Sequence, residues 1–241
     1  MRNQLVKIAG KPLRAIRSGR FWLSPVVARI SPRAGVVMAS YRHEEEGRFV
    51  EALDAWSSLK SRQRSGDGAF RHTLRAARLE HKAERYDDAV RDFTALYALH
   101  PGDERVARGL EGAALRAARQ AQSEGRWLDA CRMWAAHGRV TQKTEKSRRN
   151  LRECARYVAQ SADNADKTLL SVEAWNLLKS IDPDSREAQQ GLEWCHVSLA
   201  RAAERVGDAA TARRHWGALL ELVPGDRRGL DGLDRLSSPH A

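Results

Sequence analysis

The stretch GRWLDACRMW, residues 125–134, decides the fold of this chain because its arrangement recurs along the sequence. In it a small residue, Ala130, precedes a large aromatic residue, Trp134, by four positions. The arrangement occurs at Ala52–Trp56, Ala89–Phe93, Ala130–Trp134, Ser171–Trp175 and Ala212–Trp216, with spacings of 37, 41, 41 and 41 residues. The sequence therefore contains an internal repeat.

Four further sets of residues keep the same period. They are small residues, leucines, residue types favoured at helix N-caps, and prolines placed where a helix should stop. The sets are Ser40, Ala77, Ala118, Ala159 and Ala200; Leu110, Leu151, Leu192 and Leu233; Asp103, Thr144, Ser185 and Asp226; and Pro101, Pro183 and Pro224. Agreement among independent sets indicates that the repeat is real.

Each repeat predicts two antiparallel helices, A and B. In the third repeat, helix A is expected from after Asp103 to about Glu124, with a break at Gly125, because apolar residues recur there at helical spacing. Helix B is expected from Trp127 to Gly138. The small residues would let the two helices approach closely, and the aromatic residue would fill the space between neighbouring hairpins. Because one hairpin cannot bury its apolar face alone, we expect the hairpins to stack and the aromatic residues to be buried.

The small residue in helix A, the alanine in helix B and the aromatic residue four positions later resemble the tetratricopeptide repeat family. The resemblance covers about residues 33–236. It departs from the family in its period, 41 residues instead of about 34. It also lacks the aromatic residue early in helix A, where this sequence has Val36, Thr73, Ala114, Ala155 and His196.

The predicted fold class is all-α, a right-handed α-solenoid of about five helix-turn-helix repeats with a C-terminal capping helix. We expect an N-terminal arm over residues 1–32, a repeat domain over residues 33–236 and a tail over residues 237–241. The repeats would span about 33–66, 67–102, 103–143, 144–184 and 185–225, and the cap 226–236.

Composition and charge narrow the class of protein. Hydrophobic residues make up 42% of the 241 residues, too many for intrinsic disorder. The formal net charge is +11, yet residues 1–43 hold nine basic and no acidic residues, so the rest is nearly neutral. Three cysteines without a CxxC pair favour a reducing compartment. No apolar run reaches the roughly 18 residues of a membrane span, and no signal peptide is recognised, so we expect a cytoplasmic protein.

The sequence offers no recognised catalytic motif, such as HExxH, a P-loop, GxGxxG or GxSxG. Cys195 and His196 are adjacent, which on a helix points them about 100° apart and disfavours a nucleophile and base pair. The acidic run Glu44–Glu46 is interpreted as a solvated helix end. We therefore predict a non-enzymatic protein with no catalytic residue, cofactor, metal site or small-molecule substrate.

The family resemblance implies that the A helices line a concave groove that recognises extended peptides. Carried over, it gives one column of groove residues and a second set beside it: Tyr41, Arg78, Arg119, Gln160 and Arg201, then Arg71, Lys82, Arg156 and Arg205. Arginine can hold a carboxylate through two hydrogen bonds, so the predicted partner is a protein with an acidic segment or a C-terminal carboxylate. The alternative is that these are ordinary solvated charges paired with nearby acids.

The first twenty residues, MRNQLVKIAGKPLRAIRSGR, show the pattern of a basic amphipathic helix, which Gly10 and Pro12 would kink or divide. Such an arm suits an anionic membrane surface at the inner face of the membrane, or a partner. The residues expected to act there are Lys7, Lys11, Arg14, Arg17, Arg20, Phe21 and Trp22. Two alternatives are docking of the arm onto the first repeat as a cap and binding of nucleic acid, which the nearly neutral body disfavours.

The predicted function is a scaffold or adaptor for protein–protein interaction. An alternative from family analogy is an accessory module of an enzyme complex, because tetratricopeptide-like regions occur beside glycosyltransferases of bacterial surface-polysaccharide assembly. A helical repeat that binds nucleic acid is the third possibility.

Overall fold

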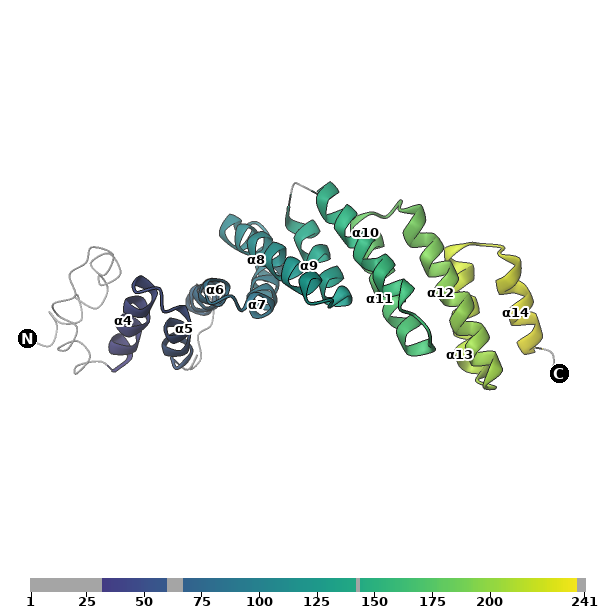
Figure 1. Cartoon of the computed structure of the whole chain (residues 1–241), viewed down its shortest axis with the longest axis horizontal. Helices are drawn as coiled ribbons and strands as arrows, with labels where there is room; N and C mark the ends of the chain where they lie inside the picture. The colour runs from purple at the N-terminus through teal and green to yellow at the C-terminus, as the bar shows by residue number, and fades with distance from the viewer. Residues whose placement is uncertain (1–31, 60–66, 142–143, 238–241) are drawn as a thin grey trace, which may run out of the picture. The chain divides into compact units, whose positions relative to one another are not determined.

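A computed structural model describes residues 32–59, 67–141 and 144–237 of the chain (Figure 1). These residues form α-helices joined by short turns, and the described part contains no strand. The chain divides into two compact units, unit 1 over Met1–Leu96 and unit 2 over Tyr97–Ala241. The predicted all-α class is confirmed.

Unit 1 contains two successive helical hairpins. Its helices are α4 (Pro32–Glu45), α5 (Phe49–Ser57), α6 (Asp67–Lys82) and α7 (Tyr86–Leu99), whose last three residues belong to unit 2. Helix α5 packs against both α4 and α6. The core between them consists of Ala52, Leu53, Trp56, Leu59 and Leu79. The first copy of the repeated phrase therefore lies in the core of unit 1.

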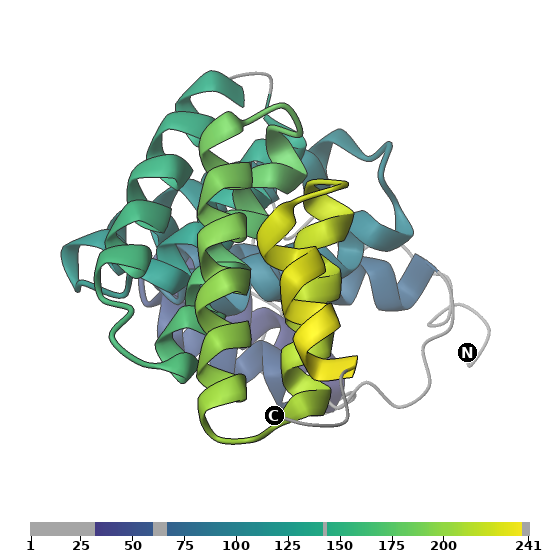
Figure 2. The same cartoon turned by 90° about the vertical axis from the view of Figure 1, so that its right-hand side faces the viewer.

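Unit 2 stacks three hairpins and one further helix. The helices are α8 (Glu104–Ser123), α9 (Trp127–Val140), α10 (Thr144–Gln160), α11 (Ala165–Ile181), α12 (Arg186–Arg205), α13 (Ala209–Leu222) and α14 (Arg227–Ser237). Each packs against the next, and Figure 2 shows α12, α13 and α14 side by side. One hydrophobic cluster runs from α8 to α12, and a second joins α12, α13 and α14. Within unit 2 the predicted stack of hairpins with a terminal helix is confirmed.

The predicted N-cap residues begin helices as expected at three of four positions. A side-chain oxygen of Asp103, Ser185 and Asp226 accepts a backbone N–H from the first helical turn, at 2.8, 3.3 and 2.8 Å respectively. These bonds satisfy donors that the helix leaves without an internal partner. Thr144 is different, because α10 begins with it. The predicted break at Gly125 is confirmed, since its φ is 72°.

The predicted end of helix B at Gly138 is wrong, because α9 continues to Val140. Gly138 is a packing residue. A methyl group there would lie 3.1 Å from Cδ1 of Ile181 and 3.2 Å from Cβ of Ser147. Gly138 thus lets α9 approach α10 and α11 closely, and it does not mark the end of a helix.

The tryptophans of the phrase are buried as predicted, with relative exposures of 1% for Trp134, 4% for Trp175 and 1% for Trp216. Two of them rest on glycine in the helix that follows. A methyl group at Gly191 of α12 would lie 2.4 Å from Cε2 of Trp175, and one at Gly232 of α14 would lie 2.5 Å from Cε2 of Trp216. The repeat pattern indicated only small residues on the hairpin's own helices, so these two glycines were not predicted.

Candidate partner-binding surface

Helices α8, α10 and α12 are the A helices of unit 2, and side-chain bonds join them in order. The amide nitrogen of Gln122 on α8 donates to Sγ of Cys154 on α10 at 3.4 Å. Arg156 on α10 binds Glu187 on α12, with 2.9 Å between Nη2 and Oε2. Each helix turns one stripe of side chains outward, opposite its buried residues. We call this surface the A-face and define it as Arg116, Arg119, Glu153, Tyr157, Gln160, Trp194, Arg201 and Arg205.

Four predicted groove residues lie on the A-face, namely Arg119, Gln160, Arg201 and Arg205, and all are exposed. In the described part of the chain, no carboxylate oxygen lies within 4.0 Å of the guanidinium groups of Arg119, Arg201 or Arg205. Arg156 differs, because two hydrogen bonds join it to Glu187 and raise its pKa. The predicted set therefore contains arginines of both kinds, paired and unpaired.

Two of the predicted groove residues of unit 1, Tyr41 and Lys82, contact charged side chains of unit 1 itself. The guanidinium carbon of Arg75 lies 3.6 Å from the ring centroid of Tyr41 and covers that ring. Lys82 forms an ion pair with Glu44 at 2.7 Å. Arg71 and Arg78 are exposed on α6. Unit 1 thus offers fewer open groups for a partner than unit 2 does.

The interpretation of Glu44–Glu46 as a solvated helix end is wrong for Glu44. Its carboxylate is partly buried between Arg75 and Lys82, at 3.0 and 2.7 Å. Burial acts to raise the pKa of Glu44, but the hydrogen bond from Lys82 and the charge of Arg75 outweigh it and lower the pKa. Glu44 therefore joins α4 to α6, two helices of unit 1.

The predicted arm residues lie outside the described part of the chain. They are Lys7, Lys11, Arg14, Arg17, Arg20, Phe21 and Trp22.

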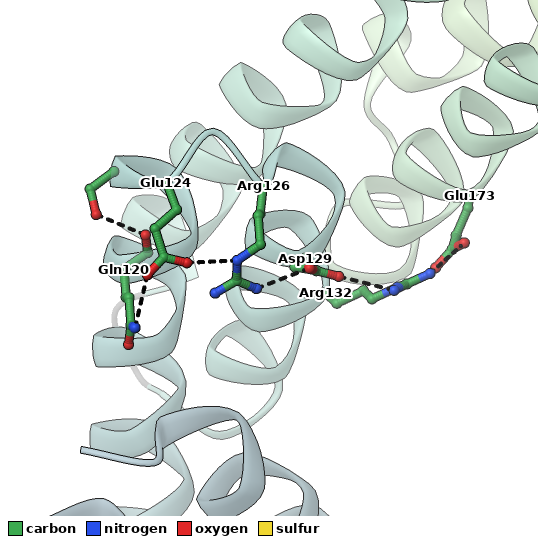
Figure 3. A network of polar contacts seen from close by, with 7 residues as sticks. Gln120, Glu124, Arg126, Asp129, Arg132 and Glu173 are labelled. Carbon is green, nitrogen blue, oxygen red and sulfur yellow. Dashed lines mark hydrogen bonds and ion pairs between the residues drawn. The ribbon is translucent and has the colours of Figure 1, made fainter.

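A second charged cluster lies in the turn before α9 and on α9 and α11, and its groups pair with one another (Figure 3). Arg126 binds Glu124 and Asp129, and Arg132 binds Asp129 and Glu173. The last pair is bidentate, at 2.7 and 3.1 Å, and joins α9 to α11. The Glu173 carboxylate raises the pKa of Arg132. These arginines are held by the protein's own carboxylates, whereas those of the A-face are not.

Sequence reasoning missed three members of the A-face, Arg116, Tyr157 and Trp194. Each lies on the same outward stripe as the predicted column, one turn before it for Arg116 and Tyr157 and two turns before it for Trp194. Tyr157 and Trp194 are 43% and 50% exposed. A search along the whole helical stripe, instead of at one repeat position, would have found them.

The three cysteines lie outside the A-face and are buried, and the described histidines range from buried to exposed. Cys131, Cys154 and Cys195 are free buried thiols, and burial raises the pKa of Cys195 to about 12. Nδ1 of His196 lies 3.2 Å from Nδ1 of His215, a contact between α12 and α13 that the sequence did not reveal. Among the described residues, no three His, Cys, Asp or Glu side chains are grouped as metal ligands would be. No helix of the described part has the length and apolarity to cross a membrane.

Comparison with solved structures finds tetratricopeptide repeat proteins of low sequence identity. No protein-family model and no curated protein matches the chain. A thermophilic tetratricopeptide repeat protein of Thermus thermophilus is 19% identical over 85% of this chain and 96% of its own, with a TM-score of 0.34. One from Parabacteroides merdae is 12% identical over 85% and 72%, with a TM-score of 0.31. The Cut9–Hcn1 structure is 14% identical over 94% and 40%, with a TM-score of 0.32.

At these TM-scores, the assignment of the fold depends on the hairpins of the chain itself. Each unit is built from antiparallel helix pairs, with buried small residues at Ala118 and Ala130 and a buried aromatic side chain at Trp134 in the pair α8 and α9. In its helical hairpins the chain is tetratricopeptide-like.

Proposed function

We propose that this chain is a scaffold for protein–protein interaction and that its A-face binds an acidic segment or a C-terminal carboxylate of a partner protein. The observation that supports this best is that exposed arginines of the A-face have no carboxylate of the chain beside them. Arg119 and Arg201 have none within 4.0 Å among the described residues, whereas Arg126, which precedes α9, and Arg132 of α9 bind carboxylates of the chain.

Charge on the A-face favours an anionic partner. It holds four arginines and one glutamate, Glu153. An exposed guanidinium offers a planar set of donors that matches a carboxylate, and it gains most when the partner supplies the missing acid. Because exposed charges are screened by salt, the affinity for such a partner should fall as ionic strength rises.

The test is binding of a fluorescein-labelled, glutamate-rich peptide, followed by fluorescence anisotropy at about 50 and about 200 mM salt. We expect binding to the wild-type chain that weakens with salt and is abolished by Arg119→Glu combined with Arg201→Glu.

A matched control changes the same charge on the B helices. Arg139 of α9 and Arg214 of α13 are exposed and, like the A-face pair, have no carboxylate within 4.0 Å in the described ranges. The double variant Arg139→Glu with Arg214→Glu should retain binding. Equal loss in both double variants would mean that only net charge matters, and retained binding in the A-face variant would remove the proposal.

We also propose that the basic arm attaches the chain to an anionic membrane surface at the cytoplasmic face. The support is the nine basic and no acidic residues in 1–43, with an amphipathic pattern over the first twenty residues. Flotation with phosphatidylserine-containing liposomes tests this. The full chain should float and a chain lacking residues 1–32 should not; equal behaviour of the two would contradict the proposal.

A further inference from the structure

Two large aromatic side chains of unit 2 are exposed, although the tryptophans of the repeated phrase in this unit are buried. Tyr157 is 43% exposed and Trp194 is 50% exposed, whereas Trp134, Trp175 and Trp216 are at most 4% exposed. A single exposed apolar residue needs no explanation. Here both lie on one surface, the A-face, between arginines that are available to a partner.

The repeat itself does not require these aromatic residues. Tyr157 corresponds to Arg116 one repeat earlier and to Ser198 one repeat later, and Trp194 corresponds to Glu153. A packing role shared by the hairpins would place similar side chains at these positions, as it does for the buried tryptophans. The two aromatics are thus specific to the second and third hairpins of unit 2.

The ring of Tyr157 is fixed by a stacking contact with another aromatic side chain. Its ring stacks on the indole of Trp127, with centroids 4.2 Å apart and an angle of 12° between the planes. Trp127 is partly buried and packs against the main core cluster of unit 2. A ring fixed in this way loses little conformational entropy when a partner side chain packs on it. Tyr, Trp and Arg are also the residue types that most often dominate binding energy at interfaces.

We infer that the partner segment carries a large apolar side chain between two carboxylates, seated on Tyr157 and Trp194 while the acids bind Arg119 and Arg201. This rests on the proposed function and names the class of segment that the A-face takes. Side-chain bonds join neighbouring A helices, which corresponds to a separation of about 10 Å, and an extended chain advances about 3.3 Å per residue. About three residues of the bound peptide therefore cover the distance from one A helix to the next. Because Arg119 and Arg201 are two A helices apart, the two carboxylates of the peptide should stand about six residues apart.

The test uses two labelled peptides of equal charge. One has the core Glu-Gly-Ser-Phe-Ser-Gly-Glu and the other replaces its phenylalanine with serine. We expect the phenylalanine peptide to bind roughly tenfold more tightly, as burial of one aromatic anchor typically gives. Tyr157→Ser, which installs the residue found one repeat later, and Trp194→Ser should each remove most of that preference without changing affinity for the serine peptide.

A control variant and the opposing outcomes separate this inference from the proposed function. Leu169→Ser removes an apolar residue of similar exposure, 45%, on α11 outside the A-face, and should leave the preference intact. Circular dichroism confirms that each variant is folded. Equal binding of both peptides, or a preference unchanged in the Tyr157 and Trp194 variants, overturns the inference and leaves the proposed function standing. If neither peptide binds the wild-type chain, both the inference and the proposed function are overturned.

Discussion

Units 1 and 2 use the same hairpin but surround its aromatic residue differently. In unit 2, Trp175 and Trp216 lie flat on the backbone of the next helix at Gly191 and Gly232. In unit 1, Trp56 stacks on the imidazole of His72 at 5.0 Å, and the guanidinium of Arg75 lies 4.7 Å from its ring. The aromatic ring thus packs against glycine in two hairpins of unit 2 and against planar polar side chains in the first hairpin of unit 1.

Buried polar side chains of unit 1 are less completely hydrogen-bonded than those of unit 2. Buried atoms without a hydrogen-bond partner in the described part of unit 1 include Nδ1 of His43, Nε2 of His72, Nε of Arg75 and Oε2 of Glu80, whereas the described part of unit 2 has one, Nε1 of Trp175. In unit 2 the indole N–H of Trp134 donates to Gln122 and that of Trp216 to Glu204, at 3.2 and 2.8 Å. Since an unpaired buried polar group costs free energy, we expect unit 1 to be the less stable unit. We also expect the pH dependence of its stability to differ from that of unit 2.

The largest effect should come from filling the space beneath a tryptophan of unit 2. Gly191→Ala places a methyl group 2.4 Å from the Trp175 indole, so the ring or helix α12 must move. We expect a loss of about 3 kcal/mol in the free energy of unfolding of unit 2, at the upper end for overpacking. Hydrogen exchange followed by mass spectrometry, which resolves the two units by peptide, measures it.

Gly217→Ala is the matched control for Gly191→Ala. Gly217 lies inside α13, and a methyl group there would meet nothing within 4 Å. Because alanine is the better helix former, this variant should gain roughly 0.5–1 kcal/mol. If Gly191→Ala gained stability as well, the flat contact between indole and glycine would not be a determinant of the fold.

The fold could be predicted from the sequence because repetition multiplies weak signals. One alanine followed by one tryptophan predicts nothing, but the pair Ala130 and Trp134 with its copies fixes a period, and N-cap residues such as Asp103 then set helix starts. The glycine contacts escaped this reasoning although glycine occurs at 68, 109, 191 and 232, all multiples of 41 apart. A glycine within a helix lowers helix propensity, and only a structure reveals the ring that lies against it.

The candidate surface was predicted less completely. A column of arginines follows from the period, but the sequence cannot tell Arg156, which binds Glu187 of the following hairpin, from Arg119, which has no such acid. Ion pairing depends on where the next hairpin places its carboxylates. Exposure of Trp194 was equally hidden, because the tryptophans of the repeated phrase, such as Trp134, are core residues.

The second prediction concerns Glu80, the buried carboxyl of unit 1. Burial, with help from the charges of Asp92 and Asp88, raises the pKa of Glu80 from 4.5 to about 7. Between these values the folded state binds more protons than the unfolded state, so stability falls as pH rises from about 4.5 to 7. Glu80→Gln should therefore stabilise α6 by about 2 kcal/mol at pH 8 and have little effect at pH 4.

Hydrogen exchange of peptides from α6 at the two pH values measures the effect of Glu80→Gln. Glu51→Gln, at an exposed position of α5, is the control and should show no such dependence. A gain from Glu80→Gln that is equal at both pH values would show that the carboxyl is not responsible.

The third prediction gives unit 2 the opposite response. Burial lowers the pKa of His215 from 6.5 to about 4, assisted by the charges of His196 and Arg214. Burial also lowers the pKa of His196, against the opposing charge of Glu221. The unfolded state then binds more protons between these values, so stability is lost as pH falls from about 6.5 to 4. His215→Met, the residue at this position two repeats earlier, should recover between about 1 and 2 kcal/mol at pH 4. A pH response of α13 that is the same in the variant and the wild-type chain would contradict this.

The smallest effect should come from the turn between helices A and B. Gly47, Gly125 and Gly207 occupy this turn in three hairpins with φ of 74°, 72° and 76°, and Glu84 occupies it between α6 and α7 of unit 1 with φ of 60°. A side chain in this left-handed conformation costs about 1 kcal/mol, which glycine avoids. Glu84→Gly should therefore stabilise the hairpin of α6 and α7 by about 1 kcal/mol. Gly125→Ala should destabilise the hairpin of α8 and α9 by a similar amount. A methyl group at Gly125 would meet nothing within 4 Å, so this substitution changes only the backbone strain. Exchange rates at both turns measure the two changes, and effects of the same sign would show that the turns are not equivalent.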